Sequence, residues 1–265
     1  MINHTFAVTA YKDSPYLVEC LESLKNQTVE SKIHITTSTP SEFISAIANK
    51  YGVELFIAEP GKGIGHDWSF CLAQAKTKYA TLAHQDDIYM PGYAEACIDA
   101  AENFDDTLIC FTEYSEIAGD KDRRGNFMLR VKRFMLWFFM PIKKNISTKF
   151  WKRKMLSMGC PIAAPSVMIN MEKLPGFQFS RDFAINIDWD AWYRMSGMEG
   201  RFVYINKVLM KHRIHPGSMT SGGLEANQRQ EEDIIMFRRF WPRWIAGMIG
   251  KLYALSYLSN KKVMR

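Results

Sequence analysis

Short apolar runs alternate with amphipathic helical patterns through the first 110 residues of the chain. Strand-like runs are expected at residues 6–10, 32–37, 53–58, 79–83 and 107–112. Helices are expected from Ser14 and over residues 41–51, 67–75 and 91–103. Strands that alternate with helices of about 10–12 residues predict an α/β fold, in which a mostly parallel sheet has helices on both faces.

Helix-capping residues fix several of these boundaries. Ser14 and Pro15 favour a helix start, because serine is a good N-cap and proline suits the first turn. The second helix is expected to end at Gly52. The run 61–65, Gly-Lys-Gly-Ile-Gly, fits neither common phosphate-loop spacing, so we interpret it as a flexible turn before a helix that begins at Asp67.

The alternation stops after Glu113. Residues 121–158 form a basic, aromatic insertion, and from Glu225 the chain is expected to be helical, with a break at Pro242. We therefore predict three parts, residues 1–115, 116–222 and 223–265.

Composition places the chain among ordinary globular proteins, with 265 residues, 47% hydrophobic and 23% charged. The five cysteines are scattered without a CxxC pair, which indicates buried thiols in a reducing compartment, the cytoplasm. No basic leader precedes the first strand, so no signal peptide is expected. The most apolar run, 134–142, is far shorter than the roughly 20 residues that cross a bilayer, so no transmembrane helix is expected.

Charge is distributed unevenly along the chain. Residues 121–154 carry 12 Lys/Arg and one acid, and residues 238–265 carry 7 Lys/Arg and none, while the whole chain has a net charge of +6. The remainder is therefore acidic, at −12. No recognised nucleic-acid-binding motif accompanies the basic segments, so we expect no nucleic-acid partner.

Candidate chemistry gathers at expected strand ends, where ligands bind in open α/β sheets. Asp86 and Asp87 follow the fourth strand, and adjacent carboxylates on extended backbone point to opposite sides. One can bind a hard cation such as Mg²⁺ or Mn²⁺ while the other accepts a hydroxyl hydrogen bond. The alternative is that Asp87 only caps a turn or helix.

Two further segments are candidates. Asp188 and Asp190 lie at an expected helix start beside Trp189 and Trp192, where the acids either act as a base next to a sugar pocket or complement the helix dipole. Residues 212–215, His-Arg-Ile-His, offer an arginine for phosphate and His215 for a metal, although a lone histidine is more often structural.

These segments together resemble the family 2 glycosyltransferases of the GT-A fold over roughly residues 5–220. The most specific stretch is the opening, with Val-Thr-Ala-Tyr-Lys-Asp at 8–13 and Asn-Gln-Thr at 26–28. His-Gln-Asp-Asp at 84–87 takes the place of the family's DxD-type metal motif. Residues 188–194 resemble its catalytic-base segment, and residues 212–218 its closing segment.

The resemblance implies a metal-dependent inverting glycosyltransferase that moves a sugar from a nucleotide-diphosphate donor to a glycan acceptor in surface polysaccharide assembly. The first two predicted parts then bind the donor and the acceptor. Asp188 would be the base, and Mn²⁺ or Mg²⁺ would be held by Asp87 and His215. Donor contacts would come from Thr9, Ala10, Tyr11, Asp13, Ser38, Asp67 and Asp86, and acceptor contacts from Trp189, Asp190 and Trp192.

The chain departs from the family pattern at three places. His84 replaces the first acid of the DxD-type motif, Ile187 replaces the Glu before the base, and residues 36–38 lack the acid that usually reads the nucleobase. UDP-, dTDP- and GDP-linked donors stay open. The alternatives are a nucleotidyltransferase, which would have a Gly-rich loop after the first strand, and a carbohydrate-binding or membrane-scaffold protein.

Two segments predict a membrane partner. Residues 130–140 and 238–258 mix Trp, Phe and Leu with Lys or Arg and lack acids, as amphipathic helices of the headgroup region do. We therefore expect a cytoplasmic protein bound peripherally to the inner, anionic face of the cell membrane, with a lipid-linked glycan as one candidate acceptor. The alternatives are that the C-terminal helix packs on the sheet or pairs in a homodimer.

Overall fold

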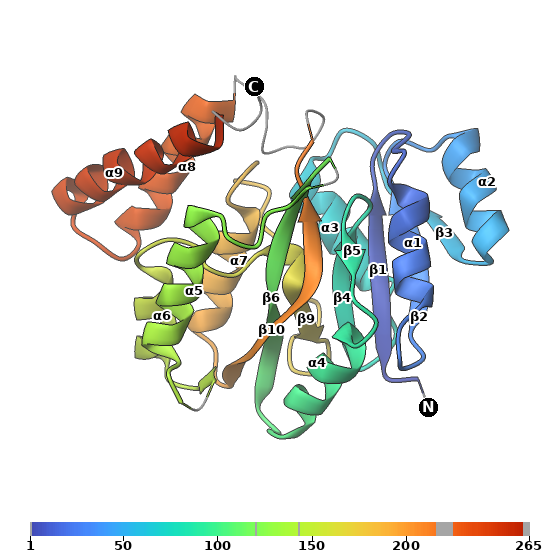
Figure 1. Ribbon diagram of the computed structural model, residues 1–265, viewed down its shortest axis with the longest axis horizontal. Coiled ribbons are helices and arrows are strands. Elements are labelled where there is room, and N and C mark those ends of the chain that lie inside the picture. Colours follow the sequence, from blue (N-terminus) through green and yellow to red (C-terminus); the bar gives the residue numbers. More distant parts are fainter. Residues whose placement is uncertain (1, 120, 143, 216–224, 262–265) are drawn as a thin grey trace.

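A mixed β-sheet with helices packed against both of its faces forms the body of the protein (Figure 1). The computed structural model describes residues 2–119, 121–142, 144–215 and 225–261. The predicted α/β fold, with C-terminal helices beside the sheet, is confirmed.

The elements of the described residues follow one another with few long connections. The strands are β1 (His4–Ala10), β2 (Lys32–Thr37), β3 (Glu54–Ile57), β4 (Tyr79–His84), β5 (Ile88–Tyr89), β6 (Thr107–Ala118), β7 (Lys121–Asp122), β8 (Asn145–Ile146), β9 (Val167–Asn170) and β10 (Arg201–Arg213). The helices are α1 (Leu17–Lys25), α2 (Glu42–Tyr51), α3 (Ile64–Ala73), α4 (Tyr93–Glu102), α5 (Phe127–Phe139), α6 (Lys149–Leu156), α7 (Ile187–Ser196), α8 (Glu225–Arg238) and α9 (Arg243–Lys261), with a short 3₁₀ turn, η1 (Ala164–Ser166).

The strand order is β3-β2-β1-β4-β9-β6-β10-β5, with β7 beside β6 and β8 beside β10. Strands β1 to β4 pair in parallel, and so do β6 and β10. Strand β9 runs antiparallel to both β4 and β6 and joins the two parallel groups. The sheet therefore continues across the predicted boundary between the first two parts, and β6 itself spans residue 115.

Two hydrophobic cores cover the two faces of the sheet. Successive residues of β1 alternate between them, since Phe6 and Val8 pack with α1, α2 and α4, while Ala7 packs with α3 and α7. This alternation is what strand geometry demands of a sheet that is covered on both sides. Because apolar side chains fill both faces of the sheet, polar side chains gather at the ends of the parallel strands.

Three predicted boundaries were wrong. Helix α1 begins at Leu17, because the Ser14 hydroxyl accepts the Tyr16 N–H (3.3 Å) and stabilises a turn before the helix. Helix α3 begins at Ile64, so two of the five residues of the expected flexible turn are helical and Asp67 lies inside the first turn of the helix. Strand β6 continues to Ala118 because it pairs along its length with the long strand β10.

The C-terminal helices pack against the body. Met236 and Phe237 of α8 and Ala246 of α9 are fully buried, and the Trp241 indole donates to the Ser157 carbonyl (2.8 Å). No helix within the described residues has the length and apolar character that a bilayer crossing requires.

Candidate active site

Polar side chains converge where β1, β2 and β4 end. Parallel pairing sets Ala10 beside Thr37 and Thr9 beside His84, so the residues that follow these three strands share one edge of the sheet. The structure thereby brings together the predicted donor-binding residues Thr9, Ala10, Tyr11 and Ser38 and the acidic segment 84–87. This edge is the ligand-binding position of open α/β sheets.

Side-chain hydrogen bonds tie the loops of this edge to one another. The Gln85 amide donates to the Tyr11 carbonyl (2.8 Å) and accepts the Tyr11 N–H (3.1 Å). The Ser38 hydroxyl donates to the Asp67 carboxylate (2.6 Å). Asp13 instead accepts from Ser41, the N-cap of α2, on the exposed side of the loop (2.6 Å). Ser38 and Asp67 thus act as one pair.

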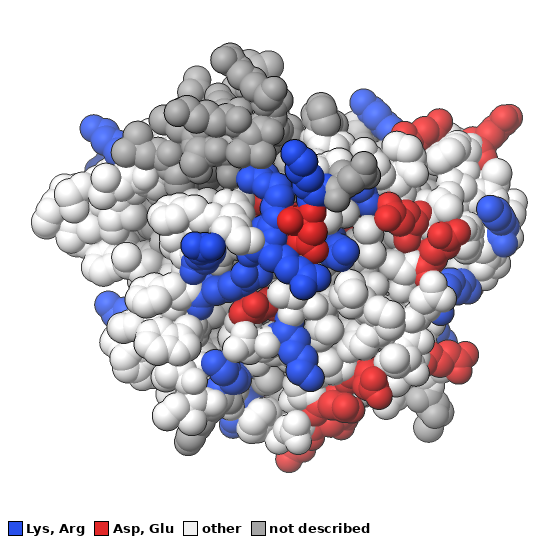
Figure 2. Space-filling view, viewed as in Figure 1, with Lys and Arg blue, Asp and Glu red and all other residues white. Residues whose placement is uncertain are grey.

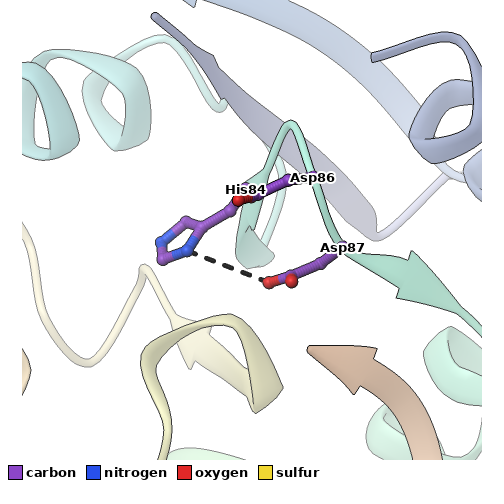
Figure 3. Close-up of side chains that lie close together, drawn as sticks. All are labelled: His84, Asp86 and Asp87. Carbon is purple, nitrogen blue, oxygen red and sulfur yellow. Dashed lines mark ion pairs between the residues drawn. The ribbon is translucent and has the colours of Figure 1, made fainter. Parts of the chain in front are cut away.

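Asp86 and Asp87 lie in the tight turn between β4 and β5 rather than on extended backbone. One atom each from His84, Asp86 and Asp87 lies within 4.8 Å of the other two (Figure 3). The two carboxylates therefore converge with the histidine on one small region. The expectation that they point to opposite sides was wrong, because the turn rotates one carboxylate toward the other.

Asp87 is held rigidly and is fully buried. Its Oδ1 accepts from His212 Nδ1 (2.9 Å) and from the Arg213 backbone N–H (3.0 Å), both at the end of β10. Its Oδ2 lies 3.9 Å from His84 Nδ1. Among the described residues, Asp87 Oδ2 and His84 Nε2 are buried atoms without a hydrogen-bond partner. Such orphaned polar atoms are costly unless a ligand completes them.

Electrostatics keep this turn negatively charged. Burial opposes the charge of Asp87, but the neighbouring His212, His84 and the Arg213 N–H together lower its pKa. Burial likewise opposes the charge of His212, yet the Asp87 carboxylate beside it raises the pKa of His212 to about 9. Burial lowers the pKa of His84, which favours the neutral ring that binds metals.

The closing segment contacts the acids in a different way from the prediction. His215 Nε2 lies 3.0 Å from Asp86 Oδ2, so this histidine contacts the converging group through Asp86. The Arg213 guanidinium bonds the Asp86 carbonyl (3.0 Å) and Glu19, and lies over the Tyr16 ring, so it is engaged within the protein. Pro216 and Ser218, also part of the resemblance, lie outside the described residues.

The residues present fit a divalent cation. Two carboxylates and a neutral imidazole supply oxygen and nitrogen donors of the kind that Mn²⁺ accepts, and Mg²⁺ accepts the oxygens. Asp87 Oδ2, a buried oxygen without a hydrogen-bond partner that lies 3.9 Å from His84 Nδ1, is the observation that supports this fit.

Asp188 lies at the first turn of α7, where its Oδ1 accepts the Trp189 N–H (2.7 Å). Burial raises its pKa, while the charges of Lys132 and Arg229 and the Trp189 N–H oppose the rise. Lys132 donates to the Tyr114 hydroxyl (2.9 Å), and the Tyr114 ring meets the ring of His212, the partner of Asp87. Lys132, whose charge acts on Asp188, is therefore linked to the acidic turn through Tyr114 and His212.

The loop before α7 is held by two buried acids of α8. Glu232 accepts the backbone N–H groups of Ala184, Ile185 and Asn186 (2.8–2.9 Å), and Asp233 accepts the Asn186 side-chain amide (2.8 Å). The amphipathic pattern of the C-terminal helices gave no indication of this role. Helix α8 thereby fixes where α7, and with it Asp188, begins.

The other members of the predicted acceptor pocket belong to the core. Trp189 and Trp192 are at most 1% exposed, and their indoles donate to the Leu156 and Ile162 carbonyls. Asp190 is 2% exposed and pairs with Arg194 (2.8 Å) and Arg239 (2.6 Å). These positions correct the expectation that the three side chains line a pocket, because all three pack inward from α7.

The buried pairs of Asp190 give a stability prediction. We expect Asp190→Asn to lower the free energy of unfolding by about 2–3 kcal/mol, below the loss for a fully buried pair because both guanidiniums keep some contact with water. Urea unfolding measures the effect. Asp106→Asn, which breaks the more exposed pair with Arg201, is the control and should cost less than about 1 kcal/mol. Lost transfer with unchanged stability in Asp190→Asn would instead give the base role to Asp190.

Several residues of this edge were not predicted. His212 binds Asp87, Gln85 joins two loops, and the Trp68 ring lies 5.0 Å from the His84 ring. The alternating polar pattern of residues 212–215 and their resemblance to a closing segment were the sequence signals for His212, and neither identified its partner.

Comparison with known proteins gives one consistent result. Residues 5–165, more than half of the chain, match the profile of the sequence family described as "Glycosyl transferase family 2". An uncharacterized glycosyltransferase of Rickettsia prowazekii is 23% identical over 228 residues, 85% of this chain and 68% of that protein. One of Methanocaldococcus jannaschii is 26% identical over 206 residues, 75% of this chain and 66% of that protein.

Solved structures share the fold. TarS 1–349 of S. aureus in complex with UDP-GlcNAc has a TM-score of 0.62 at 14% identity, over 98% of this chain and 73% of that one. The mannosyltransferase PcManGT of Pyrobaculum calidifontis, in complex with GDP-Man and Mn²⁺, has a TM-score of 0.62 at 13% identity, over 99% and 72%. At these identities the likeness establishes the fold alone.

Proposed function

We propose that this chain, which belongs to glycosyl transferase family 2, transfers a sugar from a nucleotide-diphosphate donor to the hydroxyl of a glycan acceptor with inversion. The observation that carries the proposal is the acidic turn at the end of β4. There Asp87 presents an orphaned, buried oxygen within a group of three side chains, His84, Asp86 and Asp87, that fits a divalent cation. Two structures with the same fold were solved with nucleotide sugars, one of them with Mn²⁺.

The donor is expected along the edge formed by β1, β2 and β4. The base and ribose of the donor would lie over Thr9, Ala10 and Tyr11. The Tyr11 ring is 56% exposed, with the Lys12 ammonium 5.2 Å from its centre, and offers a face on which a base could stack. The bonded pair of Ser38 and Asp67 lies at the next strand end and offers hydrogen-bond groups to the base. The diphosphate of the donor would then lie toward Asp86 and Asp87, at the end of β4.

The reaction needs a base on the face of the sugar opposite the diphosphate. Asp188 takes the proton of the acceptor hydroxyl as its oxygen bonds to the anomeric carbon, while the bond from that carbon to the diphosphate breaks. The raised pKa of Asp188 suits this role, because a stronger base accepts the proton more readily. The diphosphate leaves with the bonding electron pair.

Asp87 and His84, with Asp86, would hold Mn²⁺ or Mg²⁺, while His215 orients Asp86. When bound, the cation offsets the negative charge that gathers on the departing diphosphate. His212 and the Arg213 N–H keep the Asp87 carboxylate charged and aimed at this position.

The acceptor is proposed to be a glycan of surface polysaccharide assembly. This pathway is the one that the resemblance to family 2 implies. Residues 36–38 lack the acid that usually reads the nucleobase in the family. The identity of the donor's nucleobase is therefore the first feature to determine.

A thermal-shift panel of UDP, dTDP and GDP with Mn²⁺ tests the proposal. We expect one nucleotide to raise the melting temperature by several degrees, since a ligand at about 100 times its Kd adds about 2.7 kcal/mol of stability. The rise should disappear when Mn²⁺ is left out, and Mn²⁺ with inorganic phosphate is the control. Nucleotide binding without any donor hydrolysis would indicate a carbohydrate-binding protein, and no binding at all would contradict the proposal.

A further inference from the structure

A large apolar surface lies exposed on α5, α6 and the residues that follow α5. We define this aromatic face by Phe134, Trp137, Phe138, Ile142, Phe150 and Trp151, each more than half exposed. The centre of the Phe134 ring lies 5.9 Å from that of Trp137 and 6.3 Å from that of Phe138, and Phe150 meets Trp151 edge to face. Contiguous exposed aromatics of this extent are rare on proteins that meet only water.

Helix α9 extends the same surface. Its inward side, with Ala246 and Tyr253, packs on the body, while Trp244, Met248 and Leu252 are 73%, 54% and 62% exposed at helical spacing. Lys154 of α6 lies over both the Phe150 ring (5.6 Å) and the Trp241 ring (5.2 Å), so α6 adjoins the junction of α8 and α9. Helix α9 therefore packs on Trp189 and Phe237 with one side and exposes an apolar stripe on the other.

Positive charge surrounds this surface. Helices α5, α6 and α9 contain no Asp or Glu and ten Lys or Arg. Of these, Lys152 is buried, and Lys132 and Arg133 bond Tyr114 on the inner side of α5. Figure 2 shows a mostly uncharged area over α5 and α6 beside a dense group of Lys and Arg where β6, β10 and α5 meet. Aromatic side chains flanked by long cations match the boundary of an anionic bilayer, where rings enter the headgroup region and cations reach lipid phosphates.

We propose that the aromatic face and the exposed stripe of α9 dock this protein on an anionic lipid bilayer. A second copy of the chain fits this surface less well, because a symmetric pair would bring two acid-free, cationic rims together. Docking of this kind needs no membrane-spanning helix, and it does not depend on the proposed transfer reaction.

The docked orientation brings the bilayer close to the candidate active site. Helix α5 bears the aromatic face on one side, and on the other its Lys132 and Arg133 bond Tyr114, whose ring meets His212. A glycan on a lipid diphosphate would therefore present its sugar beside the edge of the sheet that carries the acids.

Co-sedimentation with vesicles tests the docking. The full chain is expected to pellet with vesicles of phosphatidylglycerol and phosphatidylcholine. The triple variant Phe134→Ser, Trp137→Ser, Phe138→Ser should lower its partition coefficient at least about tenfold. The matched control is Phe43→Ser with Ile57→Ser, two exposed apolar residues of α2 and β3, which should bind as the parent does. Lys149→Gln should weaken binding to anionic vesicles about fivefold and leave binding to pure phosphatidylcholine unchanged.

A second measurement uses the unaltered protein. Brominated lipids should quench part of its tryptophan fluorescence, since Trp137, Trp151 and Trp244 would enter the headgroup region. Equal unfolding midpoints would show that the variants fold. The proposal is overturned if the parent neither pellets nor is quenched, if the triple variant pellets like the parent, or if the triple substitution abolishes only a dimer, which would make the face an interface between copies.

Discussion

Replacing Asp188 by asparagine is expected to reduce sugar transfer by about 10²–10⁴, the usual cost of losing a general base. The amide keeps the shape of the side chain and can still accept the Trp189 N–H, so donor affinity should stay unchanged. Single-turnover transfer at saturating donor, together with calorimetric donor binding, separates the two effects.

The same carboxylate predicts a pH dependence. Because burial raises the pKa of Asp188 above that of an ordinary aspartate, its base form is lost as pH falls through that raised value, and transfer should fall with it. Its ionised form is the costly one when buried, so this group lowers stability at neutral pH and the cost is relieved on acidification. The residual activity of Asp188→Asn should lack this acid limb, and an unchanged limb would assign it to another group.

The second large effect is expected at Asp87. Asp87→Asn should reduce Mn²⁺-dependent turnover on the order of 10³-fold, since charge stabilisation by a metal ion is worth several kcal/mol and each 1.36 kcal/mol is tenfold. Asparagine keeps an oxygen for the Arg213 N–H, so the turn should hold its shape. Electron paramagnetic resonance detects free Mn²⁺ during a titration of the protein. Carried out with the nucleotide that gives the largest shift in the thermal-shift panel, it measures the loss of metal binding directly.

Asp122→Asn is the control for that measurement, because this acid lies among cations outside the converging group. It should bind Mn²⁺ as the parent does. Full Mn²⁺ affinity and full turnover in Asp87→Asn would remove Asp87 from the site, whereas weakened metal binding with unchanged turnover would make the reaction independent of the cation.

Local chemistry explains which parts of the fold were predictable. Helix α2 matches its prediction within one residue, because the Ser41 hydroxyl accepts the Ile44 N–H and Gly52 adopts the left-handed conformation that ends a helix. The start of α1 was wrong because the same kind of residue, Ser14, stabilises a turn instead. The extent of β6 depends on its pairing with a strand that comes about 90 residues later, which no local pattern records.

In the candidate site, too, the positions of residues along the chain were predictable and their contact partners were not. The position of the acids and of Ser38 at strand ends follows from the alternation of strands and helices. Their partners do not, since His212 and Asp87 are 125 residues apart in the chain. The burial of Trp189 and Trp192 was also missed, because aromatic residues at helical spacing suit both a core and a pocket wall. The role of Glu232 was not predicted, because the sequence pattern of α8 indicated only a helix with an exposed polar side.

The hydrogen bonds from β10 to the acidic turn also set an order of assembly. Strands β1 to β4 lie within the first third of the chain, yet Asp87 acquires both partners of its Oδ1 only from residues 212 and 213. Such distant contacts form late, because closing the intervening chain costs entropy before any contact repays it. During synthesis the early strands would therefore present an unanchored carboxylate, and the nascent protein should stay inactive until β10 has emerged from the ribosome and taken its place in the sheet.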